Sequence, residues 1–241
     1  MRYAILSDIH GNLEALEAVI QNCQKETIER YLCLGDIVGY GASPRECLGY
    51  IREISDGIIA GNHDFAVVGR IDVESFNVYA REAALWTRDQ LRPSDLAFLN
   101  DLPLVEHFDE GFTIVHSALY SPEIFDYIHC TYEASLSLGA LPGEVCFVGH
   151  SHVPVNFIRK ESIVYSFEQA LDVEAGTKVL VNVGSVGQPR DNNPDSCYAI
   201  YDTDARRISL HRVSYDVETS AAKIKKAGLP DLLGDRLKIG R

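Results

Sequence analysis

Seven side chains of the types that bind divalent metals, and one further histidine, follow apolar segments of this 241-residue chain. The seven are Asp8, His10, Asp36, Asn62, His116, His150 and His152, and the further histidine is His63. A set this large, with imidazole nitrogens and carboxylate and amide oxygens, exceeds what one ion needs. It favours a centre with two metal ions, whose common use is in-line attack by a metal-bound hydroxide on a phosphate ester.

Each of these motifs stands where a strand-like apolar run ends. The runs cover residues 2–7, 31–34, 57–60, 112–115 and 145–148. Residues two apart in extended backbone point the same way, so Asp8 and His10 can bind one ion together, and His150 and His152 have the same spacing. Glycine precedes several motifs and lets the backbone approach the ions closely. Because α/β sheets bind ligands beyond the carboxyl ends of their strands, we expect one shared site there.

Each motif is a weak signal by itself. A lone Asp-x-His is more often part of a surface loop, and a Gly-Asp after a strand is usually a turn. Five such motifs at five strand ends are difficult to obtain by chance, so the metal interpretation is favoured. The remaining histidines, His107, His129 and His211, lie outside the motifs and are interpreted as ordinary surface or loop residues.

The order of the motifs, D-x-H, G-D, G-N-H-D, H and G-H-x-H, resembles the calcineurin-like metallophosphoesterase superfamily. The resemblance runs from Asp8 to His152 and implies two divalent ions per chain, with manganese the first choice and iron, zinc or nickel the alternatives. One ion would be bound by Asp8, His10, Asp36 and His152, and the other by Asp36, Asn62, His116 and His150. By the same resemblance, Asp36 bridges both ions, and His63 is a general acid that binds neither.

The residue types suit these roles on chemical grounds. A bridging carboxylate such as Asp36 offsets the charge of two adjacent dications, which a neutral ligand would not do, whereas Asn62 adds a neutral oxygen. His63 is expected to have a pKa near neutrality and so to protonate the leaving group. The alternative for His63 is a structural role, in which its ring caps the turn after Gly61 and Asn62.

Two segments bear on the substrate. Protein phosphatases and diadenosine tetraphosphatases of the superfamily carry G-D-x-x-D-R-G, but residues 35–41 read Gly-Asp-Ile-Val-Gly-Tyr-Gly. Gly39 and Tyr40 replace the second Asp and the Arg, which argues against a protein phosphatase. Residues 182–190 resemble the N-x-G-S…P-R segment of small prokaryotic phosphodiesterases in the superfamily. Arg190 in this segment either contacts phosphate in place of the missing arginine or is a solvated loop residue.

The favoured function is therefore a phosphodiesterase for a small phosphorylated substrate, with substrate contacts from Asn62, His63 and Arg190. A phosphomonoesterase and a nucleotide or dinucleoside polyphosphate phosphohydrolase are the alternatives within the same class. A non-catalytic metal-binding scaffold on the same fold is an alternative from a different class. The presence of all seven metal-binding side chains and of His63 argues against the scaffold.

The composition limits the partners. The chain has 35 Asp and Glu against 22 Lys and Arg, and its formal charge is −13. Since nucleic-acid affinity comes largely from basic residues that neutralise phosphates, no extended nucleic-acid footprint is expected. The six cysteines show no C-x-x-C spacing, and the sequence has neither a signal peptide nor an apolar run of about 18 residues. These features predict a cytoplasmic protein without a membrane span.

The pattern of apolar residues predicts an α/β fold. Strands and helices alternate up to His63, and strands dominate from Phe112 onward, over one domain of residues 1–241. Such an arrangement suits two mixed β-sheets flanked by helices, the four-layer α/β/β/α sandwich of the superfamily. The later strands are predicted at residues 145–149, 154–159, 162–167, 178–183, 197–202 and 207–213.

Several helices have recognisable ends. Asn12 is a predicted helix cap, and Ser43 opens a predicted capping box with Pro44 at the first helical position. Residues 65–102 are predicted to form a helical insert, and a last helix is predicted over residues 216–227. The apolar stripe of the insert, which includes Phe76, Ala83 and Trp86, serves either core packing or a lid over the substrate.

Overall fold

The computed structural model describes all 241 residues and contains eight α-helices, twelve β-strands and two short 3₁₀ helices. The helices are α1 (Leu13–Cys23), α2 (Pro44–Ile54), α3 (Asn62–Val68), η1 (Val73–Ser75), α4 (Val78–Gln90), α5 (Pro93–Asn100), α6 (Thr131–Ala140), α7 (Val217–Lys226), α8 (Asp231–Asp235) and η2 (Arg236–Ile239). None of them combines the length and apolar character that a membrane-spanning helix requires.

The strands form two mixed sheets of six strands each. They are β1 (Arg2–Leu6), β2 (Arg30–Cys33), β3 (Gly57–Ile58), β4 (Val105–His107), β5 (Phe112–Val115), β6 (Val145–Val148), β7 (Val155–Arg159), β8 (Ile163–Ser166), β9 (Ala170–Asp172), β10 (Lys178–Asn182), β11 (Ser196–Asp202) and β12 (Arg207–Val213). The first sheet has the order β3-β2-β1-β11-β12-β9, and the second has the order β4-β5-β6-β10-β7-β8.

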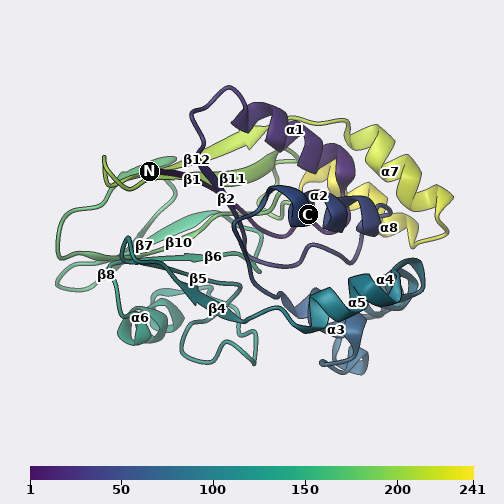
Figure 1. The fold of residues 1–241 in the computed structure, drawn as a ribbon, viewed down its shortest axis with the longest axis horizontal. Coiled ribbons are helices and arrows are strands. Elements are labelled where there is room, and N and C mark those ends of the chain that lie inside the picture. The colour runs from purple at the N-terminus through teal and green to yellow at the C-terminus, as the bar shows by residue number, and fades with distance from the viewer.

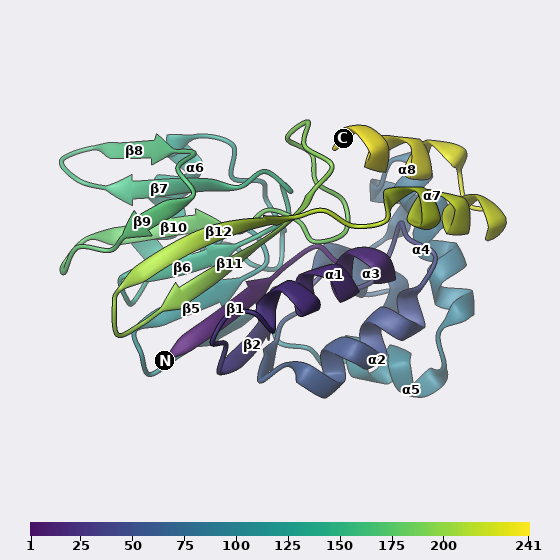
Figure 2. The same ribbon diagram turned by 90° about the horizontal axis from the view of Figure 1, so that it is seen from above.

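Parallel pairing at the centre of each sheet brings strand ends together. β1 pairs in parallel with β2, and β6 pairs in parallel with β5 and β10. The carboxyl ends of parallel neighbours meet at one edge of a sheet, so the loops after these strands gather at one end of the sandwich (Figures 1 and 2). This is the edge at which the sequence places the metal-binding residues.

The two sheets pack face to face through a core that includes Tyr3, Ile5, Phe112, Phe147 and Val181. α1 and α2 cover the outer face of the first sheet, and α6 covers the outer face of the second (Figure 1). The burial of large aliphatic and aromatic side chains on both faces of each sheet stabilises this stacking. The predicted four-layer α/β/β/α sandwich is confirmed.

The beginnings of α1 and α2 differ in how they are capped. The Asn12 side chain accepts a hydrogen bond of 3.2 Å from the backbone N–H of Ala15, as predicted for a cap. α2 begins at Pro44 as predicted, but the capping box at Ser43 is wrong, because the Ser43 side chain makes no capping hydrogen bond. Ser43 has a ψ of 50° rather than an extended value, and its own N–H donates to the Gly11 carbonyl.

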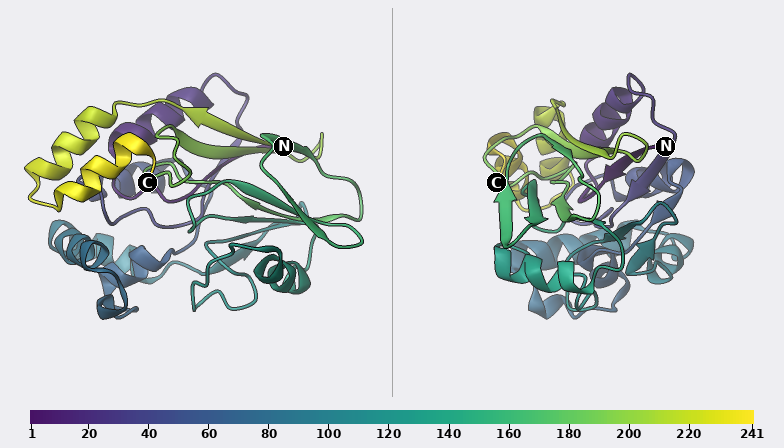
Figure 3. Two further views of the ribbon diagram at one scale, coloured as in Figure 1. Left: turned by 180° about the vertical axis from the view of Figure 1, so that it is seen from behind. Right: turned by 90° about the vertical axis from the view of Figure 1, so that its left-hand side faces the viewer.

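Two groups of helices lie at the end of the sandwich where the strand-end loops gather (Figure 3). The predicted helical insert is present as α3, η1, α4 and α5, and the predicted last helix is present as α7, which Asp216 caps. α8 and η2 follow α7 and were not predicted. Tyr40, Ala83, Leu233 and Leu237 belong to one buried apolar cluster, which joins the C-terminal helices to the insert.

Helix α6 interrupts the region where the sequence predicts mainly strands. Its buried residues are Ala134, Ser137 and Leu138, while Leu136 is 38% exposed, so the segment has no regular apolar stripe that would reveal a helix. The six later strands lie at their predicted positions within one residue at each end.

Candidate metal centre

The loops after five strands bring the metal-binding residues together. Asp8 and His10 follow β1, and Asp36 follows β2, with the Asp8 N–H donating to the Gly35 carbonyl at 3.1 Å. His116 follows β5, and the loop after β6 is linked to it, because the Gly149 N–H donates to the His116 carbonyl at 2.9 Å. Asn62, beyond β3, is the first residue of α3, and His150 and His152 follow Gly149.

The backbone at these residues is in an unusual conformation. Asp8, His10, Asp36, His150 and His152 all have φ between 51° and 65°, in the left-handed region that side chains other than glycine rarely adopt. Each such residue costs of the order of 1 kcal/mol, and such costs concentrate at functional sites. The close packing of the loops maintains the strain, since a Cβ at Gly61 would collide with Asp36 and one at Gly149 would collide with Ser7.

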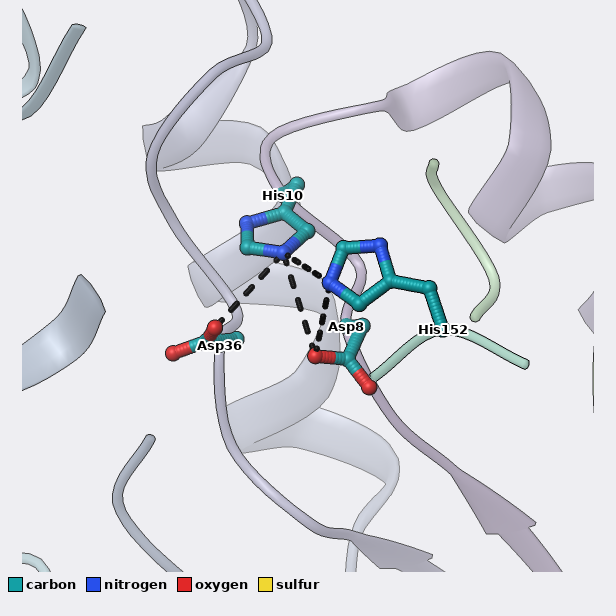
Figure 4. A group of neighbouring side chains, drawn as sticks. All are labelled: Asp8, His10, Asp36 and His152. Carbon is teal, nitrogen blue, oxygen red and sulfur yellow. Dashed lines mark hydrogen bonds and ion pairs between the residues drawn. The ribbon is translucent and has the colours of Figure 1, made fainter. Parts of the chain in front are cut away.

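One group of ligand atoms consists of the side chains of Asp8, His10, Asp36 and His152 (Figure 4). All four are buried, and one ligand atom of each lies within 4.8 Å of the others. Nε2 of His10 is 3.1 Å from Nε2 of His152, and Nε2 of His152 is 3.2 Å from Oδ1 of Asp8. Nitrogen and oxygen atoms that converge at these distances form a cage suited to one small cation.

A second group consists of Asp36, His116 and His150, and it shares Asp36 with the first. Oδ2 of Asp36 is 3.4 Å from Nε2 of His116 and 3.6 Å from Nε2 of His10, so one carboxylate oxygen faces both groups. Asn62 adds a buried Oδ1 atom that has no hydrogen-bond partner. The structure thus places these side chains in two groups, with Asp36 belonging to both.

Backbone carbonyl groups orient three of the histidines. The Nδ1 atoms of His10, His116 and His152 lie 3.1, 2.7 and 2.5 Å from the carbonyl oxygens of Val38, Leu34 and Gln188, respectively. A carbonyl accepts only a protonated nitrogen, so each ring carries its proton on Nδ1 and turns Nε2 toward the centre. This is the usual arrangement behind a metal-binding histidine.

Several buried polar atoms of the two groups lack a partner. They are Oδ1 of Asp8, Oδ1 of Asn62 and the Nε2 atoms of His116 and His150. Buried acceptors are rarely left unsatisfied in proteins. Asp8, His116 and His150 belong to the two groups of converging ligand atoms. These oxygen and nitrogen atoms suit divalent cations once His116 has released its Nε2 proton, so the residues fit the metals that the sequence predicts.

The protonation of the groups also suits metal binding. Burial lowers the pKa of His150 to about 3 and lowers the pKa of His10 and of His152, so these rings are neutral near pH 7. Burial alone would raise the pKa of Asp36, but the neighbouring histidines, His116 first, together outweigh burial and hold that pKa well below its usual range. Burial alone would lower the pKa of His116, but Asp36 and Asp8 together outweigh burial and raise that pKa to about 9, so a cation there must displace a proton.

Comparison with known proteins identifies the family. A model of the calcineurin-like phosphoesterase superfamily domain matches residues 1–206. The chain belongs to the calcineurin-like phosphoesterase superfamily. The family is one of metal-dependent hydrolases, in agreement with the clustered His and Asp side chains. The resemblance that the sequence motifs indicate is confirmed.

Two relatives of this phosphoesterase match it over almost its full length, and a third matches part of it. An uncharacterised protein of Methanocaldococcus jannaschii is 40% identical over 242 residues, which cover 99% of this chain and 98% of that protein. The crystal structure of a metallophosphoesterase from Sphaerobacter thermophilus is 39% identical, covers 100% of this chain and 99% of that chain, and has a TM-score of 0.87. A symmetrical bis(5′-nucleosyl)-tetraphosphatase of Actinobacillus pleuropneumoniae is 26% identical over 140 residues, which cover 56% of this chain and 52% of that protein.

His63 of the phosphoesterase is buried beside both groups and belongs to neither. Its ring lies 4.4 Å from the ring of Tyr40 and 4.8 Å from that of Phe76, measured between centres, and its Nδ1 has no hydrogen-bond partner. Burial lowers the pKa of His63 to about 4, and the charge of Asp36 offsets this only in part. The expectation of a pKa near neutrality is therefore wrong, because it did not allow for complete burial of the ring.

Asp64 has a role that the sequence motifs did not reveal. Its carboxylate accepts hydrogen bonds from the backbone N–H groups of Asp36, Ile37, Val38 and Gly61, at 2.7, 3.1, 3.3 and 3.0 Å. These four donors belong to the loops after β2 and β3. Asp64 thus fixes the loop that carries Asp36 against the loop that carries Asn62.

Arg190 is half-buried and lies next to the centre. Its guanidinium donates to Oε1 of Gln188 at 2.9 Å, and its Nε atom is buried without a partner. After burial, the charge of Arg190 is the largest influence that lowers the pKa of His152. Its Cζ atom is 5.8 Å from the centre of the Tyr40 ring, so Arg190 lies beside the residue that occupies the place of the missing arginine.

A cavity of about 400 Å³ opens beside Asn62, His63 and His150. The rest of its lining is mainly apolar and includes Phe76 and Tyr127, whose ring stacks on His150 with 4.0 Å between centres. This volume lies within the usual range for sites that bind small molecules. The predicted apolar stripe serves two purposes, because Phe76 lines the cavity and Ala83 is fully buried in the core.

The three histidines outside the motifs, His107, His129 and His211, belong to neither group of ligand atoms.

Proposed function

We propose that this phosphoesterase binds two divalent ions, manganese in the first instance, and hydrolyses phosphodiesters of small organic molecules. The observation that carries the proposal is the position of Asp36, whose Oδ2 faces His10 on one side and His116 on the other. A carboxylate shared between two sets of ligands is the arrangement that holds two cations about 3.5–4 Å apart.

The reaction follows from the placement of the surrounding residues. Two divalent ions bound here would supply the hydroxide nucleophile and offset the charge on the phosphate. Arg190, with its Nε unpaired, binds a phosphate oxygen, and Asn62 contributes a second contact at the mouth of the cavity. The apolar walls of the cavity receive one ester group and exclude water from it.

His63 donates the proton to the departing ester oxygen in this proposal. Its ring faces the cavity and is held between Tyr40 and Phe76. Burial disfavours the charged ring, but the negative charge of a bound phosphate counteracts this effect and raises the pKa of His63 toward the range in which it carries a proton. His63 is thus protonated most readily when a substrate is in place.

The preference for a diester rests on Tyr40 and on the cavity. Tyr40 stands where protein phosphatases have an arginine, so the doubly charged end of a monoester has one cationic contact fewer. An apolar cavity beside the ligands accommodates an organic group more readily than a free phosphate oxygen. The second candidate function is dinucleoside polyphosphate hydrolysis, which the partial similarity to the Actinobacillus pleuropneumoniae tetraphosphatase favours.

The proposal is tested by measuring metal content and turnover on the same preparation. We expect about two ions per chain after loading with manganese, iron, zinc or nickel, and faster hydrolysis of bis-p-nitrophenyl phosphate than of p-nitrophenyl phosphate. Dinucleoside polyphosphates in the same panel examine the second candidate. At most one ion per chain in metal-rich buffer, or metal-loaded protein that hydrolyses no phosphate ester, would contradict the proposal and favour a scaffold.

A further inference from the structure

Arg236 approaches the site from the C-terminal helices. It is the first residue of η2, and its neighbour Leu237 is buried in the apolar cluster that also contains Tyr40. Through this packing the guanidinium of Arg236 lies with its Cζ atom 6.0 Å from the centre of the Tyr40 ring. A residue from the far end of the chain thus reaches the ring that borders the cavity.

Arg236 and Arg190 lie around the same ring. Their Cζ atoms are 6.0 and 5.8 Å from its centre, and both side chains are half-buried. No Asp or Glu side chain pairs with either guanidinium, although the chain has 35 acidic residues. Arg190 donates to the Gln188 side chain, and Nε of Arg236 donates to the main-chain oxygen of Arg241, which leaves the remaining N–H donors of Arg236 for another acceptor. By contrast, Arg206 is paired with Glu144, and Arg212 with Asp191.

Two neighbouring positive charges that no Asp or Glu side chain pairs are unfavourable in a half-buried place. Burial, followed by the charge of Arg190, lowers the pKa of Arg236. The cost of bringing the two guanidinium groups together is relieved when an anion lies between or beside them. A guanidinium has five N–H donors, so Arg190 can contact the scissile phosphate and a second anion at once.

We propose that Arg190 and Arg236 form a second anion site next to the metal centre, so that the substrate carries another acidic group besides the scissile phosphate. The inference rests on the proposed phosphoesterase function and narrows its substrate class. Arg190 lies close enough to the ligand groups for its charge to lower the pKa of His152, whereas Arg236 reaches the Tyr40 ring from the C-terminal helices. A second phosphate is the preferred occupant because guanidinium groups bind phosphate oxygens in pairs, and a carboxylate is the alternative source of the same charge.

The site is tested with competitive inhibitors of bis-p-nitrophenyl phosphate hydrolysis by the metal-loaded full chain. Ethylphosphonate provides one anion, ethane-1,2-diphosphonate and propane-1,3-diphosphonate provide two, and 3-phosphonopropanoate replaces the second by a carboxylate. We expect at least one diphosphonate to bind about 10- to 100-fold more tightly than ethylphosphonate, the range of a charge-assisted hydrogen bond. Arg236→Gln should reduce this ratio to near one, and Arg236→Lys should restore part of it.

The control is Lys238→Gln, which removes one positive charge from the same short helix. Lys238 is exposed and paired with Glu218, so this variant should keep the parental ratio. A parental ratio near one for every dianion, or a ratio that Arg236→Gln leaves unchanged, would overturn the inference. If a diphosphonate inhibits by removing the metals, it inhibits the parent and Arg236→Gln equally. The ratio is then unchanged by the substitution, and this result would also overturn the inference.

The failure of this inference can be distinguished from the failure of the proposed function. If the loaded protein hydrolyses no ester, the same phosphonates are titrated calorimetrically against it. A diphosphonate advantage that depends on Arg236 then supports the anion site on a protein that is not an esterase. Hydrolysis without that advantage supports the esterase and contradicts the anion site.

Discussion

The ring of His63 lies against the bare α-carbon of Gly39. A Cβ atom at position 39 would be only 2.7 Å from Nδ1 of His63, and Gly39 has a φ of 88°, which further disfavours any other residue. Gly39 stands where superfamily phosphatases have an aspartate, so no carboxylate at this position orients the histidine. Packing against Tyr40 and Phe76 positions His63 instead, and no acidic partner at this place raises its pKa.

The low pKa of His63 predicts a particular pH dependence. A general acid acts only when protonated, and the pKa of about 4 places His63 mostly in its neutral form at neutral pH. The ratio of kcat/KM for an alkyl diester to that for a nitrophenyl diester should therefore fall about tenfold per unit as pH rises from 5 to 8. The ratio cancels the pH dependence of metal binding, which both substrates share. A ratio that stays constant to pH 7 would show that His63 is not the acid.

Replacement of His63 should separate chemistry from metal binding. His63→Gln should keep both ions and lower turnover about 10²–10⁴-fold, the usual contribution of a general acid. The loss should be smaller for nitrophenyl esters, whose leaving groups need little protonation. Metal analysis beside the kinetics is decisive, because a variant that lost an ion would identify His63 as a ligand.

Replacement of Asp36 should remove metal and activity together. Asp36→Asn keeps the shape of the side chain but cannot offset two adjacent dications, and Asp36 faces both groups of ligand atoms. We expect fewer than one ion per chain by mass spectrometry and no measurable turnover. The matched change at the exposed Asp89 should affect neither. Full occupancy of two ions in Asp36→Asn would refute the shared ligand.

Asp64 should act through the backbone rather than through the substrate. Asp64→Asn replaces one acceptor oxygen by an amide that faces N–H donors, and so leaves up to two of the four N–H groups without a partner. The cost should be about 2–6 kcal/mol of stability when two donors are left unpaired, from roughly 1–3 kcal/mol for each. Chemical denaturation measures this cost, and metal affinity should fall with it. Asp109→Asn, at an exposed position, is the control, and equal stability of the two variants would contradict this role.

Arg190 should matter for substrate binding and not for the metals. Arg190→Ala should lower kcat/KM for diesters about 10- to 100-fold, as expected for the loss of about 1.5–3 kcal/mol from a charged hydrogen bond. Both ions should remain bound, and Arg207→Ala, which removes an exposed arginine far from the centre, should have parental kinetics. A preference for phosphoserine peptides, with Arg190→Ala equal to the parent, would overturn the interpretation of this arginine.

The residues of the candidate metal centre could be located from the sequence because each follows the end of an apolar strand within a few residues. A local pattern of strand and polar residue is enough to place Asp8 or His116 at the edge of a sheet, whatever the rest of the chain does. The predicted capping box at Ser43 is wrong because the backbone there depends on a contact with a distant part of the chain. Its side chain has the right type and spacing, but the loop that holds Gly11 sets the backbone angles of Ser43.

The residues that the sequence did not reveal act over long distances along the chain. Asp64 binds backbone groups of a loop that precedes it by more than twenty residues, and no side-chain motif marks such a contact. Arg236 meets Tyr40 only because the C-terminal helices pack on the insert. The low pKa of His63 likewise depends on the burial of its ring by Tyr40 and Phe76, which becomes known only with the fold.

The hydrogen bonds from His10, His116 and His152 to main-chain carbonyls have an evolutionary consequence. A carbonyl oxygen stays in place when the side chain of its residue changes, so mutations at Val38, Leu34 or Gln188 need not disturb the ligand rings. The cavity walls and the C-terminal helices, by contrast, present side chains to the substrate. Mutations of the residues that line the cavity can therefore change the substrate specificity of related proteins, while the orientation of the three histidine rings is kept.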